Sequence, residues 1–91
     1  MTDGPPWELV VTTRAEREMR RLPTQEQARI QQAMDALHNG PNHGDIRKLE
    51  DRPGEWRLRV GDYRVIFGRD SANRVILVLR VLHRRDAYRD A

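Results

Sequence analysis

Arginine, histidine and tyrosine gather in the second half of this sequence in a pattern that suits chemistry on a phosphate group. Arg57 and Arg59 alternate with apolar residues, Arg64 lies on the next apolar stretch, and His83 and Tyr88 follow near the C-terminus. Guanidiniums bind phosphate oxygens and stabilise the extra charge of a transition state, histidine exchanges protons near neutral pH, and tyrosine stacks on bases. These residue types predict metal-independent RNA cleavage by attack of the neighbouring 2′-hydroxyl.

Positive charge is concentrated in the same half of the chain. The 91 residues carry 17 Lys and Arg against 14 Asp and Glu, a formal net charge of +3. Residues 1–45 have five basic residues against seven acidic ones, whereas residues 46–91 have twelve against seven. Lys48 is the single lysine, and arginine is the side chain that binds phosphate in a planar fork. We therefore expect an anionic partner, although a bias in genomic base composition would also give this arginine content.

Several classes of protein are excluded or disfavoured by what the sequence lacks. It has no Cys, so neither a disulfide framework nor a thiolate metal site can form. The three His are scattered with few acids nearby, and we expect neither a metal ion nor a cofactor. No apolar run approaches the roughly 18 residues of a membrane span, and the N-terminus does not resemble a signal peptide. We expect a cytoplasmic protein without membrane contact, with a flexible tail at 1–6 and a single domain at 7–91.

Two amphipathic helices are predicted in the first half, after a short strand over residues 7–11. Residues 13–16, Thr-Arg-Ala-Glu, have the spacing of a capping box, and apolar residues then recur at helical spacing until Pro23. A second apolar stripe covers residues 30–37, and Gly40-Pro41 is typical of a helix end. The pattern indicates an αα-hairpin.

From residue 46 onward the apolar period changes to two, which predicts strands. We expect a short strand at 46–49, a hairpin closed by Gly61-Asp62, and an almost wholly apolar strand at 75–82. Residues 52–55 suit a type II turn, and residues 70–73 a further turn. The order of elements indicates an α+β fold, in which an N-terminal strand and the αα-hairpin pack on a small, mainly antiparallel four-stranded sheet.

A two-residue loop at Gly61-Asp62 fixes which side chains share a face of the hairpin. It pairs Val60 with Tyr63 and places Arg57, Arg59 and Arg64 together, with Arg59 directly opposite Arg64. Like charges at opposed positions cost roughly 0.2–1 kcal/mol, and the sequence places no acid between these arginines. An anionic ligand on this face would turn the repulsion into a binding site; three solvated arginines that splay apart are the alternative.

A four-residue turn at 70–73 would extend this register into the next strand. Arg69 would then pair with Arg74, and Leu79 would lie beside Arg64. The alternation places five further residues on the arginine face: Leu77, Leu79, Val81, His83 and Arg85.

Segments spread over residues 7–89 carry a likeness to a known family. They are Thr12-Thr13-Arg14-Ala15, Arg21-Leu22-Pro23, Lys48-Leu49, W-R-L-R-V-G-D-Y-R-V-I-F at 56–67 and V-L-H-R-R-D-A-Y at 81–88. With these segments the chain resembles RelE-type toxins of the RelE/ParE superfamily, found in bacterial and archaeal toxin–antitoxin pairs. The resemblance implies a RelE-like fold and an endoribonuclease that enters the ribosomal A site, cuts mRNA there and inhibits translation. It also implies a cognate antitoxin that wraps the toxin and carries the part that binds operator DNA, so the toxin would reach DNA only indirectly.

The resemblance also implies a role for each residue on the arginine face. Arg64 matches the family's phosphate-stabilising arginine. Arg57 and Arg59 fall where relatives often carry lysines that bind RNA or accept a proton. Arginine is a poor general base, so this chain needs another proton acceptor. His83 is the preferred candidate, and Glu55 is a distant second.

The C-terminal segment matches the family in two further positions. Arg84, or alternatively Arg85, matches the arginine that assists the leaving group, and Tyr88 matches a terminal tyrosine; the arginine of the pair that is not catalytic would bind RNA. Two other functions stay open at this point. A ParE-type toxin has the same fold but inhibits DNA gyrase, and a catalytically weak homologue would only bind an antitoxin.

Overall fold

The structure is a computed structural model that describes residues 6–41 and 44–87. Most of the expected tail at 1–6, together with His43 and Tyr88, lies outside the described residues. The elements in chain order are β1 (Glu8–Val11), α1 (Thr13–Arg20), α2 (Thr24–Asp35), the 3-10 helix η1 (Ala36–Asn39), β2 (Asp45–Lys48), β3 (Glu55–Val60), β4 (Tyr63–Asp70), β5 (Val75–His83) and α3 (Arg84–Ala87).

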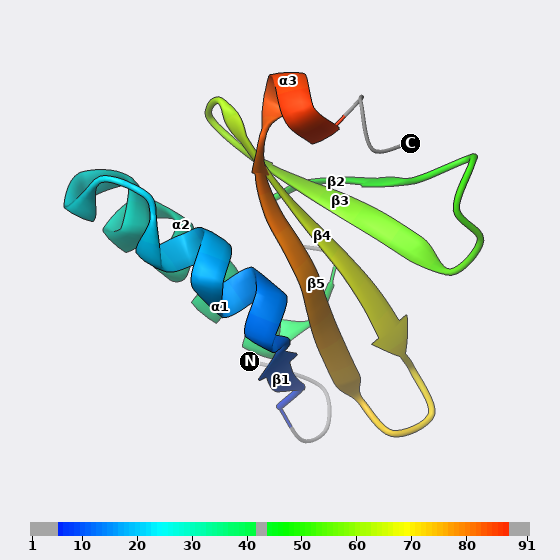
Figure 1. The fold of residues 1–91 in the computed structure, drawn as a ribbon. Coiled ribbons are helices and arrows are strands. Elements are labelled where there is room, and N and C mark those ends of the chain that lie inside the picture. The colour runs from blue at the N-terminus through cyan, green and yellow to red at the C-terminus, as the bar shows by residue number, and fades with distance from the viewer. Residues whose placement is uncertain (1–5, 42–43, 88–91) are drawn as a thin grey trace.

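All five strands form one sheet in the order β1-β5-β4-β3-β2. Strand β1 pairs in parallel with β5, and the other neighbours are antiparallel. Helices α1 and α2 lie on one face of the sheet, and α3 follows the C-terminal end of β5 (Figure 1). The predicted α+β fold is confirmed. The sheet has five strands rather than four because the N-terminal strand joins it beside β5.

The core lies between the two long helices and the sheet face that they cover. Phe67, Val65 and Val78 from the sheet are fully buried, as are Ile30 and Leu37 from the helical layer. Burying one such side chain contributes about 1.5–3 kcal/mol. This helix-covered face therefore holds the fold together, and the opposite face, called the open face below, is left for other roles.

The junction between β1 and α1 is built by Thr12. Its hydroxyl accepts a hydrogen bond from the Ala15 amide at 3.1 Å, so Thr12 is the N-cap. The capping box expected at residues 13–16 is therefore wrong by one residue. Thr13 is already inside the helix, and Glu16 pairs instead with Arg20 at 3.3 Å.

Two of the predicted turns are confirmed. The Glu55 amide donates to the Arg52 carbonyl at 3.0 Å, and Gly54 has a φ of +82°, as the third position of a type II turn requires. Val60 pairs with Tyr63 across Gly61-Asp62, as the two-residue loop predicts.

The hairpin of β4 and β5 departs from the predicted register twice. The loop covers residues 71–74, with Arg74 at a φ of +53°, and joins the paired residues Asp70 and Val75. This moves the register by two residues and leaves every side chain on its expected face. A bulge then follows, because Phe67 pairs with Val78 whereas Ile66 pairs with Arg80. The extra residue between them is Leu79.

The bulge reverses the faces of the residues beyond it. Arg64 lies opposite Leu82 instead of Leu79, and Val81 lies opposite Val65 in the core. Leu77, before the bulge, lies opposite Gly68 on the open face as predicted. A residue remote in sequence contacts the backbone at the bulge. The Thr12 amide donates to the Val78 carbonyl and its hydroxyl donates to the Leu79 carbonyl, at 3.0 and 3.2 Å.

Candidate functional site

The arginines of the open face stand in two adjacent rows across the sheet. One row is Asp45, Arg59, Arg64 and Leu82, and the next is Arg47, Arg57, Ile66 and Arg80. The predicted grouping of Arg57, Arg59 and Arg64, with Arg59 opposite Arg64, is confirmed. Arg47 was missed because its side chain joins the group only through the pairing of β2 with β3, which no short turn in the sequence fixes.

Arg64 is the most buried charged side chain that the structure describes, with 6% of its surface exposed. Its Nη1 donates to the carbonyls of Gly61 and Tyr63, at 3.0 and 2.9 Å. Its Nε is buried and has no hydrogen-bond acceptor. The hairpin thus fixes the guanidinium in one orientation while one charged donor stays unsatisfied, which costs at least about 1–3 kcal/mol.

Arg57 and Arg59 share one carboxylate from the neighbouring strand. Asp45 Oδ1 lies 3.8 Å from Arg57 Nη1, and Asp45 Oδ2 lies 4.0 Å from Arg59 Nη1. These are ion pairs beyond hydrogen-bond length, and Arg57 Nη1 is buried without an acceptor. No acid lies between the opposed Arg59 and Arg64, but β2 brings Asp45 to the other side of Arg59, a neighbour that the sequence did not predict. The alternative expectation was that all three arginines are solvated and splay apart. Arg59 is mostly exposed and fits it, whereas Arg57 and Arg64 are largely buried and do not.

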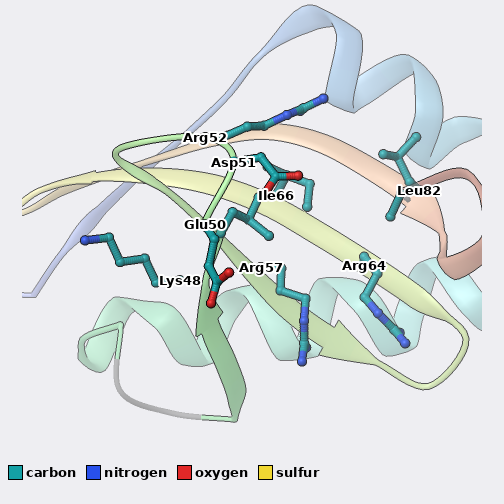
Figure 2. A pocket seen from close by; sticks show the side chains of 10 residues that line it. Lys48, Glu50, Asp51, Arg52, Arg57, Arg64, Ile66 and Leu82 are labelled. Carbon is teal, nitrogen blue, oxygen red and sulfur yellow. The ribbon is translucent and has the colours of Figure 1, made fainter. Parts of the chain in front are cut away.

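A pocket of about 250 Å³ opens beside Arg57 and Arg64. Its apolar walls come from Ile66 and Leu82, and the segment 48–52 borders it from the β2–β3 connection. The guanidiniums of Arg57 and Arg64 extend in the same direction, whereas the amine of Lys48 points away from them (Figure 2). Two cationic donors beside an apolar surface suit a ligand with a phosphate and a base or sugar.

His83 lies on the helix-covered face, and its expected place on the arginine face is wrong. It stands directly opposite Tyr63, with the two rings edge to face at 5.4 Å between centroids. Its Nδ1 accepts from the Arg85 amide at 3.3 Å. His83 therefore docks the start of α3, and the bulge at Leu79 is the reason that it does not meet Arg64.

Helix α3 is anchored to the tip of the β3–β4 hairpin. The Arg84 amide donates to the Asp62 carbonyl at 2.7 Å, and Arg84 Nε lies 3.9 Å from Asp62 Oδ1. Arg85 lies in α3 rather than in the strand that was expected to carry it onto the arginine face. The side chains of Arg84 and Arg85 are exposed, and Ala87 lines the pocket. The assignment of Tyr88 falls outside the described residues.

Several other basic residues have structural partners elsewhere. Arg80 forms a bidentate pair with Glu18 of α1 at 2.8 Å, and the Arg69 guanidinium lies 3.9 Å above the Trp56 ring. Some basic residues of the second half therefore stabilise the fold through these contacts, and others lie together on the open face.

Two further side chains that could exchange a proton, Glu55 and His38, do not line the pocket. Glu55 lies 3.6 Å from Arg52 and borders a different groove, and His38 Nδ1 is 2.7 Å from the Trp7 carbonyl. Within residues 6–41 and 44–87, no three His, Asp or Glu side chains are placed to hold a metal ion. No helix in those ranges is long and apolar enough to cross a membrane.

Comparisons with known proteins identify the family of the chain. The family described as ParE toxin of type II toxin–antitoxin system matches residues 9–88. The Toxin RelE of Mycobacterium tuberculosis is 28% identical over 90 residues, which cover 98% of this chain and 93% of that protein.

Two solved toxin–antitoxin complexes share the fold. The RelE–RelB complex from Pyrococcus horikoshii matches with a TM-score of 0.75 at 26% identity, over 87% of this chain and 96% of that one. A RelBE complex from Mycobacterium tuberculosis matches with a TM-score of 0.72 at 30% identity, over 87% of this chain and 99% of that one. The fold, the arginine rows on the open face and these matches lead to one conclusion: the chain belongs to the RelE/ParE family of toxins of type II toxin–antitoxin systems.

Proposed function

We propose that this toxin is a metal-independent endoribonuclease that cuts mRNA in the ribosomal A site. The observation that carries the proposal is the pair Arg57 and Arg64, two largely buried arginines that border one pocket. Each has a guanidinium nitrogen without a hydrogen-bond acceptor. A phosphodiester bound in the pocket would place anionic oxygens beside these two guanidiniums and form charge-assisted hydrogen bonds with them.

The proposed role of each arginine follows from how far its side chain is exposed. Arg64 is held by two backbone carbonyls, so it is oriented before the substrate arrives and stabilises the charge that develops on the phosphate. Arg57 and the exposed Arg59 bind the RNA backbone, and its phosphate replaces Asp45 as their shared anionic partner. Arg84 and Arg85 border the same end of the sheet and serve the leaving group and the RNA chain.

The cellular setting follows from the family. The two solved relatives are complexes with antitoxins, and we propose a cognate antitoxin partner for this chain in the cytoplasm. Contact with operator DNA would go through that antitoxin.

The test is to add the purified toxin to a translation reaction and map the 5′ ends of the mRNA. We expect cuts at codons in the A site, and none in mRNA with a 2′-deoxy nucleotide at the cut. Intact mRNA in the translation reaction contradicts the proposal.

A second function is favoured by the family match itself, which is to ParE toxins. A ParE-type toxin would inhibit DNA gyrase with the same fold. A supercoiling assay with purified gyrase separates the two: inhibition alongside intact mRNA supports the ParE-type function, and cut mRNA with normal supercoiling supports the ribonuclease.

A further inference from the structure

Cleavage by a 2′-hydroxyl needs a group that removes its proton, and the arginines of the two rows cannot supply it. A guanidinium stays protonated in proteins, so Arg57, Arg59 and Arg64 cannot take that role. The question is which described side chain beside the pocket can accept a proton.

Within residues 6–41 and 44–87, neither histidine lies beside the guanidiniums, and the lysine amine is directed away from them. His83 lies on the helix-covered face with its Nδ1 engaged by the Arg85 amide, and His38 contacts the Trp7 carbonyl beside β1. Lys48 borders the pocket, but its amine points away from Arg57 and Arg64 (Figure 2). A carboxylate is the remaining type of acceptor.

Three carboxylates lie around the arginines, and their positions differ. Asp45 already bridges two guanidiniums, and it does not border the pocket. Asp51 borders the pocket over Ile66, with its carboxylate away from the guanidiniums (Figure 2). Glu50 borders the pocket with its carboxylate directed to the same side as the guanidiniums of Arg57 and Arg64 (Figure 2). Glu50 makes no ion pair with the residues that the structure describes.

The backbone holds Glu50 at the rim of the pocket. The Leu49 amide before it donates to the Glu55 carbonyl at 3.0 Å, and the Glu55 amide closes the type II turn after it, also at 3.0 Å. These two hydrogen bonds close the segment 49–55 onto the end of β3. The acceptor therefore lies on a short, tied connection rather than on a free loop.

We propose that Glu50 is the proton acceptor of the cleavage reaction, an inference that rests on the proposed ribonuclease function. The 2′-hydroxyl proton moves to a carboxylate oxygen of Glu50, and the freed electron pair forms the bond from the 2′-oxygen to phosphorus. The bond from phosphorus to the 5′-oxygen breaks, and the leaving oxygen takes a proton from water. The hydroxide so formed recombines with the proton released from Glu50. The products are a 2′,3′-cyclic phosphate and a 5′-hydroxyl.

The variants Glu50→Gln, Glu50→Asp and Glu26→Gln test this role. Glu50→Gln keeps the size of the side chain and removes the acceptor, and Glu26→Gln makes the same change on α2. General bases contribute roughly 10²–10⁴-fold, so we expect single-turnover mRNA cleavage by Glu50→Gln to fall by about 100-fold. Glu50→Asp should recover part of the rate, and Glu26→Gln should match the wild type.

Binding and pH dependence distinguish a proton acceptor from a charge that merely repels RNA. Removing a negative charge beside the arginines should leave ribosome affinity unchanged or tighter, so the rate should fall without any loss of affinity. The wild-type rate should fall on acidification, and that fall should be lost in Glu50→Gln.

Three results overturn the assignment. They are equal rates for the wild type and Glu50→Gln, a loss of affinity that accounts for the loss of rate, and a larger loss in Asp51→Asn than in Glu50→Gln. Intact mRNA with the wild-type toxin overturns the ribonuclease function together with this role, whereas active wild type and active Glu50→Gln overturn only the role of Glu50.

Discussion

Strand β4 buries side chains on both of its faces, but the two faces are buried at different cost. On the helix-covered face Val65 and Phe67 are fully enclosed by other apolar side chains. On the open face Arg64 is nearly as buried, at 6% exposed, yet its Nε has no acceptor. Burial of apolar surface stabilises a fold, whereas burial of an unsatisfied charged donor opposes it. The first face explains why the chain folds, and the second is the face on which we propose that RNA binds.

The difference extends to the neighbouring strands. Apolar residues of β3 and β5 continue the helix-covered face, and the arginine rows with the pocket continue the open face. Under the proposed function, stability and RNA cleavage depend on different residues of the same strands, and single substitutions should separate them.

Phe67→Ala should have the largest effect, and it should act on folding. Removing a fully buried phenyl ring costs roughly 3–5 kcal/mol, a large part of the stability of a domain of 91 residues. Denaturant unfolding measures the loss. Per folded molecule, RNA cleavage at low temperature should be near the wild-type value. Loss of activity in protein that is still folded would contradict the division between the faces.

Arg64→Met should have the opposite profile. Losing a fixed donor beside a developing charge typically costs about 2.7–4 kcal/mol of transition-state stabilisation, roughly 10²–10³-fold in rate. Stability should change little, because removal of the unsatisfied Nε offsets the loss of the two hydrogen bonds to the carbonyls of Gly61 and Tyr63. Single-turnover cleavage and thermal unfolding of the same preparation check both parts. An unfolded Arg64→Met variant would show that Arg64 holds the fold instead.

The arginine face was predictable from the sequence because local rules determine it. Gly61-Asp62 fixes the pairing of β3 with β4, and alternation then places Arg57, Arg59 and Arg64 together. The place of His83 was not predictable. It depends on the bulge at Leu79. At this bulge the Thr12 hydroxyl donates a hydrogen bond to the Leu79 carbonyl, 67 residues away in sequence. Glu50 and Asp45 were missed for a related reason: they join the site through the pairing of β2, whose connection to β3 has no regular loop length.

Glu18 connects the two faces at the edge of β5, beyond the end of β1. Its carboxylate accepts from the Val81 amide at 2.9 Å and pairs with Arg80 at 2.8 Å, and both side chains are largely buried. Glu18→Ala leaves that amide without its acceptor, so we expect a loss of roughly 1–3 kcal/mol in unfolding free energy. The matched control is Glu16→Ala on the same helix, whose exposed pair with Arg20 is worth roughly 0.3–0.5 kcal/mol. Equal losses would show that the contact at the strand edge is no stronger than a surface pair.

The smallest effect is expected at the far end of β4, where Asp70 belongs to neither face. A hydrogen bond from the Asn73 side chain, and then one from the Asn73 backbone amide, lower the pKa of Asp70 below its ordinary value of 3.8. Because the pKa is lower in the folded state, this contribution to stability is complete above about pH 3.8 and is lost as the pH falls through the folded-state pKa. Unfolding free energies of the wild type and Asn73→Ala, measured from neutral pH downward, should converge in acid. A gap that stays constant with pH would show that Asn73 acts on the loop without acting on the charge of Asp70.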